Sequence, residues 1–338
     1  MATVIRYHFL NSAFSPQRFV ADILHMRTLG TYEQYITMHF NNMPYAHMGL
    51  SFLAWHRAFL WEFERDLQAA DRHAGRPGTW PKDGNIGVPY WDWTTENSPN
   101  PADARGRLWG PTFMGGSGSP VTGPFAPAAW PPPSLLASSG VTGLNRDLGA
   151  IGVLSNTTDV NYALGLNTFD VAPFTETGPN TGTTPTSFRS VVEGQTLPTN
   201  VPLGSGPSPP MHSSTARMHN RGHSWVGGIM NMVPISPYDP VFWLNHSNVD
   251  RLWVRWQIAH SANAGQWPSD AAIDALYPST GTRPRNVFKR SEYMRPWIPP
   301  GASRGWRPAD VLNWQAMGPS SEHKYRYDTD PPGSFRFS

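Results

Sequence analysis

The sequence predicts a mainly α-helical protein with long irregular loops, folded as a single domain over residues 1–338. Two groups of segments carry apolar residues at helical spacing, one within residues 15–75 and one within residues 217–260. Stretches rich in Pro, Gly and Ser lie between and after them, at roughly 96–145, 176–216 and 278–308. No linker separates two hydrophobic regions that could each fold alone, so we expect one domain.

Composition excludes several classes of partner and site. The chain has 26 Lys and Arg against 24 Asp and Glu and no basic block, so we expect no nucleic-acid partner. No apolar run reaches the ~18–20 residues that span a bilayer, so we expect no membrane insertion. The chain contains no Cys, so any metal must be held by His or carboxylate side chains.

The first group of helices begins at Ser15, a predicted N-cap that precedes Pro16 at the first helical position, and this helix ends at Gly30. The stretch "TYEQYITMHF" predicts a short helix carrying His39. A longer helix follows in "LSFLAWHRAFLWEFERDLQAADRHAG". Its Phe52, His56, Phe59 and Phe63 recur at steps of four, three and four, which places them on one face.

The second group contains "RMHNRGHSW", in which His219 and His223 lie four residues apart and therefore face the same way on a helix. The last long helix is predicted in "DPVFWLNHSNVDRLWVRWQIAH", where Phe242, His246 and Val249 share a face. Asp239 is the predicted N-cap of this helix.

Six of the twelve histidines therefore fall into two trios, His39, His47 and His56 in the first group and His219, His223 and His246 in the second. Three neutral imidazoles leave a metal open to a substrate and suit copper, zinc, iron or nickel. Two all-nitrogen sites without a carboxylate favour a pair of copper ions. On spacing alone, ordinary core histidines remain an equal alternative.

Several motifs resemble those of the tyrosinase family. The stretch "AHMGLSFLAWHRAFLWEFERDLQ" resembles the first copper motif of tyrosinases, and "MHNRGHSWVGG" with "SPYDPVFWLNHSNVDRLW" resembles the second. "VPYWDWT" is similar to the structural motif between them, and "IRYH" and "YRY" resemble the Arg and Tyr-x-Tyr pair that brackets the core domain. The resemblance implies a type 3 copper protein of the bacterial tyrosinase kind.

This resemblance implies a four-helix bundle with a dinuclear copper site at its centre. Copper A would be bound by His39, His47 and His56, and copper B by His219, His223 and His246, with O2 as co-substrate. The chain departs from the family pattern at Asn245, where a second His often precedes the last ligand, and in a longer segment before His219. It also stops soon after "YRY", so we expect no C-terminal domain covering the site.

The implied activity is a copper-dependent phenol oxidase that hydroxylates monophenols at the ortho position and oxidises ortho-diphenols to ortho-quinones, as in melanin biosynthesis. The alternatives are an ortho-aminophenol oxidase, a catechol oxidase without monophenol activity, an O2 carrier and a histidine-rich structural protein without metal. The expected partners are a small phenolic substrate, O2 and a helper protein that delivers copper. The chain begins without a signal-peptide pattern, so we expect a cytoplasmic protein or one exported with that helper.

Other residues have predicted roles around the copper site. By the resemblance, Asn220 and Glu193 hold a water that takes the proton of a monophenol, the alternative for Glu193 being a surface carboxylate at a helix end. Val233 corresponds to a family position at the rim of the copper B pocket, or else packs in the core. We expect Phe52 and Phe242, each four residues before a His, to pack on imidazoles, with Phe242 at the substrate pocket; the alternative is that both are ordinary core aromatics. We expect Asp250 to form a structural salt bridge with an Arg, the alternative being an acceptor that orients His246.

Overall fold

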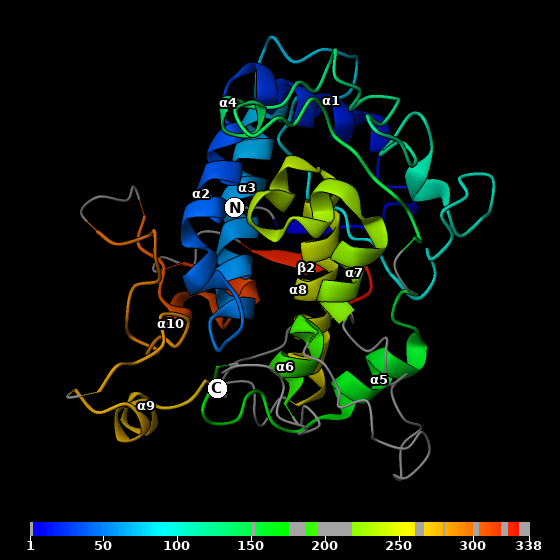
Figure 1. The fold of residues 1–338 in the computed structure, drawn as a ribbon. Coiled ribbons are helices and arrows are strands. Elements are labelled where there is room, and N and C mark those ends of the chain that lie inside the picture. The colour runs from blue at the N-terminus through cyan, green and yellow to red at the C-terminus, as the bar shows by residue number, and fades with distance from the viewer. Residues whose placement is uncertain are drawn as a thin grey trace.

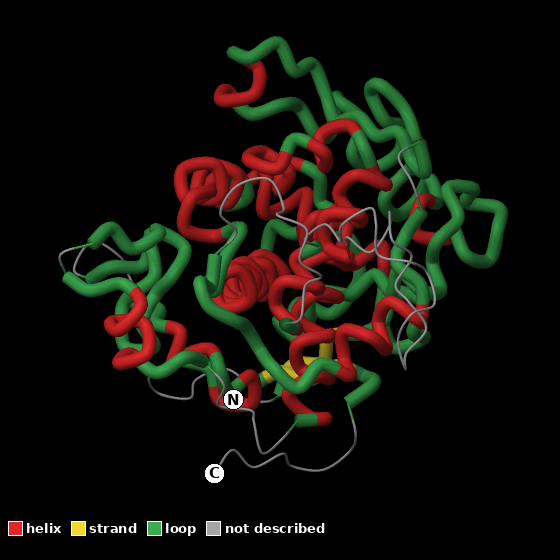
Figure 2. The backbone as a smooth tube through the Cα atoms, turned by 60° about the horizontal axis from the view of Figure 1, so that its bottom comes forward, coloured by secondary structure: helices red, strands yellow, loops and turns green. Residues whose placement is uncertain are grey.

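Helices form the centre of the molecule and loops run around them, as Figures 1 and 2 show. This computed structural model describes residues 3–150, 153–175, 187–194, 218–260, 267–279, 281–299, 304–318 and 324–330. The α-helices are α1 (Pro16–Thr28), α2 (Glu33–Ala46), α3 (Phe52–Arg72), α4 (Ser134–Ala137), α5 (Thr157–Gly165), α6 (Phe188–Glu193), α7 (Met218–Val226), α8 (Val241–Ala259), α9 (Asp270–Leu276) and α10 (Pro308–Val311). Short 3-10 helices are η1 (Arg107–Trp109), η2 (Gly228–Asn231), η3 (Val233–Tyr238) and η5 (Trp314–Ala316), and the strands are β1 (Val4–Arg6) and β2 (Tyr325–Tyr327).

Four helices, α2, α3, α7 and α8, gather from the two predicted groups and form the core of the fold (Figure 1). Aromatic side chains hold α3 against α8. The Phe63 ring stacks on Trp243 with 3.5 Å between centroids, and Phe59 lies 5.0 Å from the same indole. Burying such rings is the largest apolar gain that a small set of side chains gives. The predicted mainly helical fold with a central bundle is confirmed.

The start of α1 agrees with the predicted N-cap, whereas the end of α2 differs from the prediction. The Ser15 hydroxyl accepts a hydrogen bond from the Arg18 amide at 3.3 Å, which confirms it as the cap of α1. The helix predicted over "TYEQYITMHF" is longer than expected, since α2 continues through Pro44 to Ala46. Pro44 removes one backbone donor, but it lies in the last turn, where the helix ends in any case.

The prediction that Asp239 caps α8 is wrong. The N-cap is Pro240, which makes no side-chain capping hydrogen bond. Asp239 lies one residue earlier, and its carboxylate oxygens each lie 2.7 Å from a guanidinium nitrogen of buried Arg146, while the Val241 amide also donates to it. A long-range ion pair therefore determines the position of Asp239 at the start of α8.

The two strands join the beginning and the end of the described chain. β1 pairs in parallel with β2, with Val4 opposite Tyr325 and Arg6 opposite Tyr327. The fully buried Arg6 guanidinium lies 3.7 Å from the centroid of the Tyr325 ring and donates to Glu64 and Asp250. The Arg and the Tyr-x-Tyr pair singled out by the resemblance therefore lie in contact.

Asp250 is the acceptor at the centre of this network. Arg6 and Arg57 both form ion pairs with it, and the hydroxyls of Tyr325 and Tyr327 donate to it at 2.6 and 2.8 Å. The predicted structural salt bridge of Asp250 is confirmed, with two arginines in place of one.

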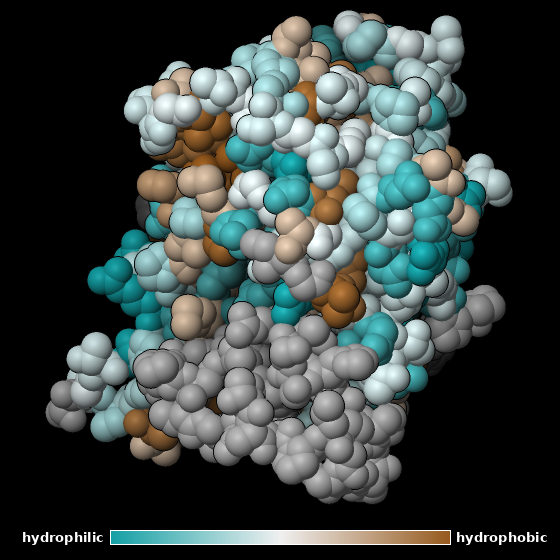
Figure 3. All heavy atoms as spheres, turned by 45° about the vertical axis from the view of Figure 1, so that its right-hand side comes forward, coloured by the Kyte–Doolittle hydropathy of each residue, from teal (hydrophilic) through white to brown (hydrophobic). Residues whose placement is uncertain are grey.

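On the face drawn in Figure 3, apolar residues form separate patches among hydrophilic ones. Within the described residues, no helix combines the length and the apolar character needed to cross a bilayer.

Candidate metal centre

The four central helices bring the two histidine trios together. His39 lies on α2, His47 directly follows the end of α2, and His56 lies on α3; the second trio comes from α7 (His219, His223) and α8 (His246). Within each trio the ligand atoms lie within 4.8 Å of one another. The rings of His56 and His246 stack with 4.2 Å between centroids, so the two trios face a common space.

Backbone carbonyls fix the orientation of four of these rings through Nδ1. The Nδ1 atoms of His39, His56 and His223 lie 3.1, 2.9 and 2.7 Å from the carbonyl oxygens of Pro234, Phe52 and Met230, respectively. The Nδ1 of His219 lies 3.2 Å from the Glu193 carbonyl oxygen. A carbonyl only accepts hydrogen bonds, so each of these Nδ1 atoms carries the proton and each Nε2 presents a lone pair.

The Nε2 atoms of the second trio lie close together. The His219 Nε2 lies 3.1 Å from the His246 Nε2 and 2.9 Å from the His223 Nε2. Within the described part of the chain, the Nε2 atoms of His39, His47 and His56 have no hydrogen-bond partner. Buried acceptors that face each other are unfavourable unless a cation lies between them, so the residues fit a metal ion in each trio.

Burial keeps all six imidazoles neutral. It lowers the pKa of His39 to about 3 and that of His223 to about 4, and it lowers the pKa of the other four well below the usual range. Neighbouring imidazoles lower several of these values further. A neutral imidazole is the form that binds a metal, so the trios are ready for binding at neutral pH.

Aromatic rings hold the imidazoles from the sides, as predicted. The Phe52 ring lies 4.8 Å from the rings of both His56 and His219, so it contacts one member of each trio. The Phe242 ring lies 4.2 Å from His246 and 5.2 Å from His39. These contacts restrict ring rotation and exclude water from the centre.

Comparison with known proteins identifies the family. Residues 29–259 match the common central domain of tyrosinase.

The chain belongs to the tyrosinase family.

Relatives of this tyrosinase-family chain match most of its length. It is 34% identical over 300 residues to a tyrosinase of Streptomyces antibioticus, covering 85% of this chain and 89% of that protein. It is 32% identical over 294 residues to the grixazone synthase of Streptomyces griseus, covering 77% and 86%. Among solved structures, a polyphenol oxidase from Thermothelomyces thermophila shares the fold with a TM-score of 0.58 at 20% identity, covering 96% of this chain and 88% of that one. The chain is therefore a copper-dependent phenol oxidase of the tyrosinase type, and its two trios are compatible with two copper ions.

The tyrosinase resemblance singled out Glu193 and Asn220, and the structure places both beside His219. Glu193 is the last residue of α6 and is buried, so the alternative of a surface carboxylate is wrong. Its carboxylate lies 2.9 Å from the Arg189 guanidinium and accepts a short hydrogen bond from the Met48 amide. The Asn220 side chain donates to the Gly194 carbonyl at 3.2 Å, and its oxygen lies 3.0 Å from the His219 Nδ1. The intervening residues 195–217 lie outside the described residues.

Val233 opens η3 and is partly buried. The segment around it contacts both trios, because the Met230 carbonyl accepts from His223 and the Pro234 carbonyl accepts from His39. These two carbonyls were not found from the sequence, since a backbone acceptor leaves no signature in residue type.

Asn245 connects the structural motif "VPYWDWT" to the second trio. Its fully buried side chain accepts a hydrogen bond from the Trp93 indole at 2.9 Å, which connects "VPYWDWT" to α8. A Cβ at Gly222 would lie 2.4 Å from the Asn245 Oδ1. The glycine therefore allows α7 to approach α8 beside the second trio.

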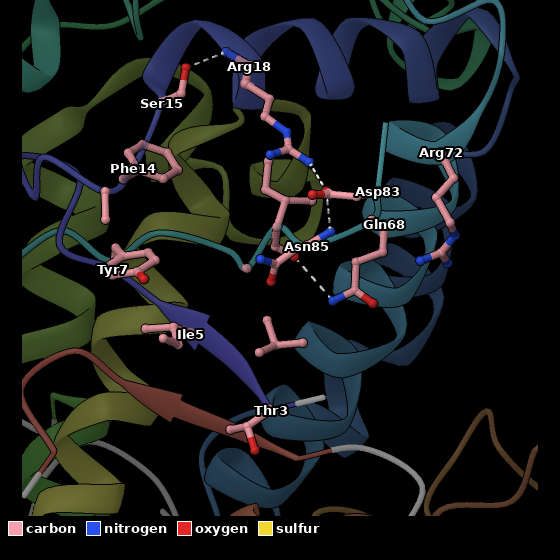
Figure 4. Close-up of a pocket in the computed structure, with 15 residues that line it drawn as sticks. Thr3, Ile5, Tyr7, Phe14, Ser15, Arg18, Gln68, Arg72, Asp83 and Asn85 are labelled. Carbon is pink, nitrogen blue, oxygen red and sulfur yellow. Dashed lines mark hydrogen bonds and ion pairs between the residues drawn. The ribbon is translucent and has the colours of Figure 1, made fainter. Parts of the chain in front are cut away.

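A separate cavity of about 550 Å³ lies near β1 and the start of α1, and none of the six histidines lines it (Figure 4). Arg18 points across it to Asp83, 2.6 Å away, and also pairs with Asp71. Arg72 also lines this cavity, which is distinct from the metal centre.

Proposed function

We propose that this protein uses O2 to hydroxylate monophenols at the ortho position and to oxidise ortho-diphenols to ortho-quinones. In this proposal His39, His47 and His56 bind one copper ion and His219, His223 and His246 bind the other. The observation that carries it is the convergence of six neutral, buried imidazoles in two trios, each with its ligand atoms within 4.8 Å of one another.

A bound copper pair supplies the exchange of two electrons between a phenolic substrate and O2. The protein's residues supply the geometry for that chemistry. Carbonyls at Nδ1 hold four of the rings, while Phe52 and Phe242 pack against imidazoles of both trios and keep the centre dry. Oriented imidazoles of this kind would hold the metals in place for a bound phenol.

We also propose that Glu193 and Asn220 hold a water that accepts the proton of a monophenol. A phenol has a pKa of ~10 and is mostly protonated at neutral pH, so its binding as a phenolate requires a proton acceptor. The Glu193 carboxylate is buried, lies beside the Arg189 guanidinium and accepts from the Met48 amide, while the carbonyl of the same residue lies 3.2 Å from His219 Nδ1. Asn220 lies next to His219 with its side chain anchored to Gly194.

The test of the function is a side-by-side assay of tyramine, catechol and 2-aminophenol on copper-loaded protein. We expect oxygen uptake and coloured product with tyramine and with catechol. Oxidation of catechol without tyramine would reduce the function to a catechol oxidase. A preference for 2-aminophenol would favour the aminophenol oxidase; the similarity to a relative named for grixazone synthesis is the reason to include this substrate.

Changing Glu193 to Gln, or Asn220 to Ala, is expected to lower tyramine hydroxylation by roughly a hundredfold, the scale of a lost proton acceptor, and catechol oxidation much less. The ratio of the two rates in each variant is the measurement. Copper content is measured in parallel, because Glu193 also contacts Arg189 and the Met48 amide. An unchanged ratio with two coppers bound would show that another group or bulk water takes the proton.

Val233 is proposed to border the route of the substrate to the copper centre, since its neighbours contact His223 and His39. Replacing it by Phe is expected to raise the KM for a bulky phenol several-fold and to change the KM for catechol little. Equal changes for both substrates would assign Val233 to packing.

Domain organisation, copper delivery and location in the cell complete the proposal. We propose that residues 1–338 form one domain, because buried apolar side chains from Val4 to Tyr327 belong to one cluster. We further propose that a helper protein delivers copper, since all six histidines are buried. The enzyme then works in the cytoplasm or leaves the cell with that helper, and gel filtration of the co-expressed pair is the measurement.

A further inference from the structure

His47 differs from the other five histidines in how it is held. It lies outside the helices, at the C-cap of α2, with extended backbone angles of φ −128° and ψ 163°. Among the described residues, neither of its ring nitrogens makes a well-formed hydrogen bond. Burial lowers the pKa of this imidazole, and the nearby Met43 carbonyl opposes only part of that effect. The direction of this ring therefore depends on the backbone that follows α2.

That backbone has an unusual conformation at the next residue. Met48 has φ +60°, in the left-handed region that a residue with a side chain rarely adopts. Its side chain is exposed, with 52% of its surface accessible, so apolar packing does not explain the conformation. Such a residue keeps this conformation only where its surroundings hold it.

The side chain of Asn286 supplies much of that hold. Its buried Nδ2 donates to the carbonyl oxygens of both His47 and Met48, each at 2.8 Å. The Thr175 hydroxyl lies 3.2 Å from both the Asn286 Oδ1 and the Met48 carbonyl oxygen and can donate to either. The Asn286 backbone oxygen accepts from the Ser51 amide at 3.0 Å. One amide group thus fixes the two carbonyls on either side of the left-handed turn.

Gly49, the residue after Met48, lies directly against the Asn286 side-chain amide. A Cβ at Gly49 would lie 2.6 Å from both Cγ and Nδ2 of Asn286, so only glycine leaves room for the contact. Gly49 also pairs with Thr175 through an isolated β-bridge, which connects the turn to a further segment. Asn286, Thr175 and the turn from His47 to Gly49 form one packed unit.

We propose that Asn286 is a positioning residue for copper A: it holds the left-handed turn at Met48 and thereby directs the His47 imidazole at the metal. This inference rests on the proposed function for the assignment of His47 as a ligand. The other two members of the first trio have carbonyl partners of their own at Pro234 and Phe52. Loss of the Asn286 amide weakens one copper site and leaves the second trio intact.

The test compares Asn286→Ala with Asn313→Ala. The control also removes an Asn side chain that is hydrogen-bonded to the backbone, since Asn313 accepts from the Gln315 amide at the N-cap of η5. Apoprotein is titrated with copper in competition with a chelator, and bound copper is counted after desalting. We expect two tightly bound coppers in the wild type and in Asn313→Ala. In Asn286→Ala we expect one copper to bind tightly and the affinity for the second to fall by about tenfold or more. This is the usual loss of metal affinity when a residue that orients a metal ligand is removed.

A double-variant cycle separates positioning from general destabilisation. If Asn286 acts through His47, then adding Asn286→Ala to His47→Ala lowers copper affinity no further. A further loss in the double variant, or two coppers of wild-type affinity in Asn286→Ala, overturns the inference. Asn286→Asp, which keeps the shape of the side chain and loses the NH2 donor, is titrated in the same way and decides the case if Asn286→Ala does not fold. A wild type that binds fewer than two coppers would overturn the proposed function instead.

Discussion

Replacing His246 by Ala is expected to remove one of the two coppers and to reduce catechol oxidation below detection. His246 lies in the second turn of α8, is buried, and stacks on His56 across the two trios. The reaction needs two one-electron centres at a fixed separation, so a protein with one metal site lacks half of the machinery. Copper content by atomic absorption and oxygen uptake with catechol are the measurements.

The matched control for this variant is His25→Ala. His25 lies on α1, outside both trios, with its Nε2 2.9 Å from the Nδ1 of His73. We expect this variant to bind two coppers and to oxidise catechol at the wild-type rate. Two coppers and normal turnover in His246→Ala would disprove the assignment of the second trio.

Replacing Asp250 by Ala is expected to lower the free energy of unfolding by about 3–5 kcal/mol, the usual cost of removing one partner from a buried ion pair. Asp250 is 4% exposed and accepts from two guanidinium groups and two tyrosine hydroxyls. Its removal leaves Arg57 and part of the charge of Arg6 buried without their acceptor. Urea unfolding of the apoprotein, followed by Trp fluorescence, measures the change.

Asp103→Ala serves as the comparison, because its partner Arg105 is mostly exposed and water screens the pair. We expect no measurable change in unfolding for this variant. If Asp250→Ala unfolds at the same urea concentration as Asp103→Ala, the Asp250 network does not stabilise the fold.

Much of the centre could be predicted from the sequence because its residues lie on helices. A spacing of four places His219 and His223 on one face, and the aromatic residue four positions before His56 packs on it as expected. Ser15 capped its helix because an N-cap is a local interaction between near neighbours. Imidazole alone suits several metals; two all-nitrogen sites side by side favoured copper, and the resemblance to a family strengthened that choice.

The parts that could not be predicted depend on contacts between distant segments. Asp239 reads as a cap locally, but Arg146, far away in the sequence, determines its place. The carbonyls that orient His39 and His223 come from a 3-10 segment that has no helical periodicity. Asn286 lies in a Pro-rich stretch expected to be a surface loop, and nothing in its surroundings points to His47.

The pairing of β1 with β2 determines which contacts a growing chain can form during its synthesis. Arg6 and Arg57 leave the ribosome early, and Asp250 follows with α8, whereas the tyrosines of β2 are among the last residues described. All six histidines are therefore synthesised before the strand that completes the Asp250 network. During translation, a nascent chain holds the full set of metal-binding side chains while the contact that ties its beginning to its end is still missing.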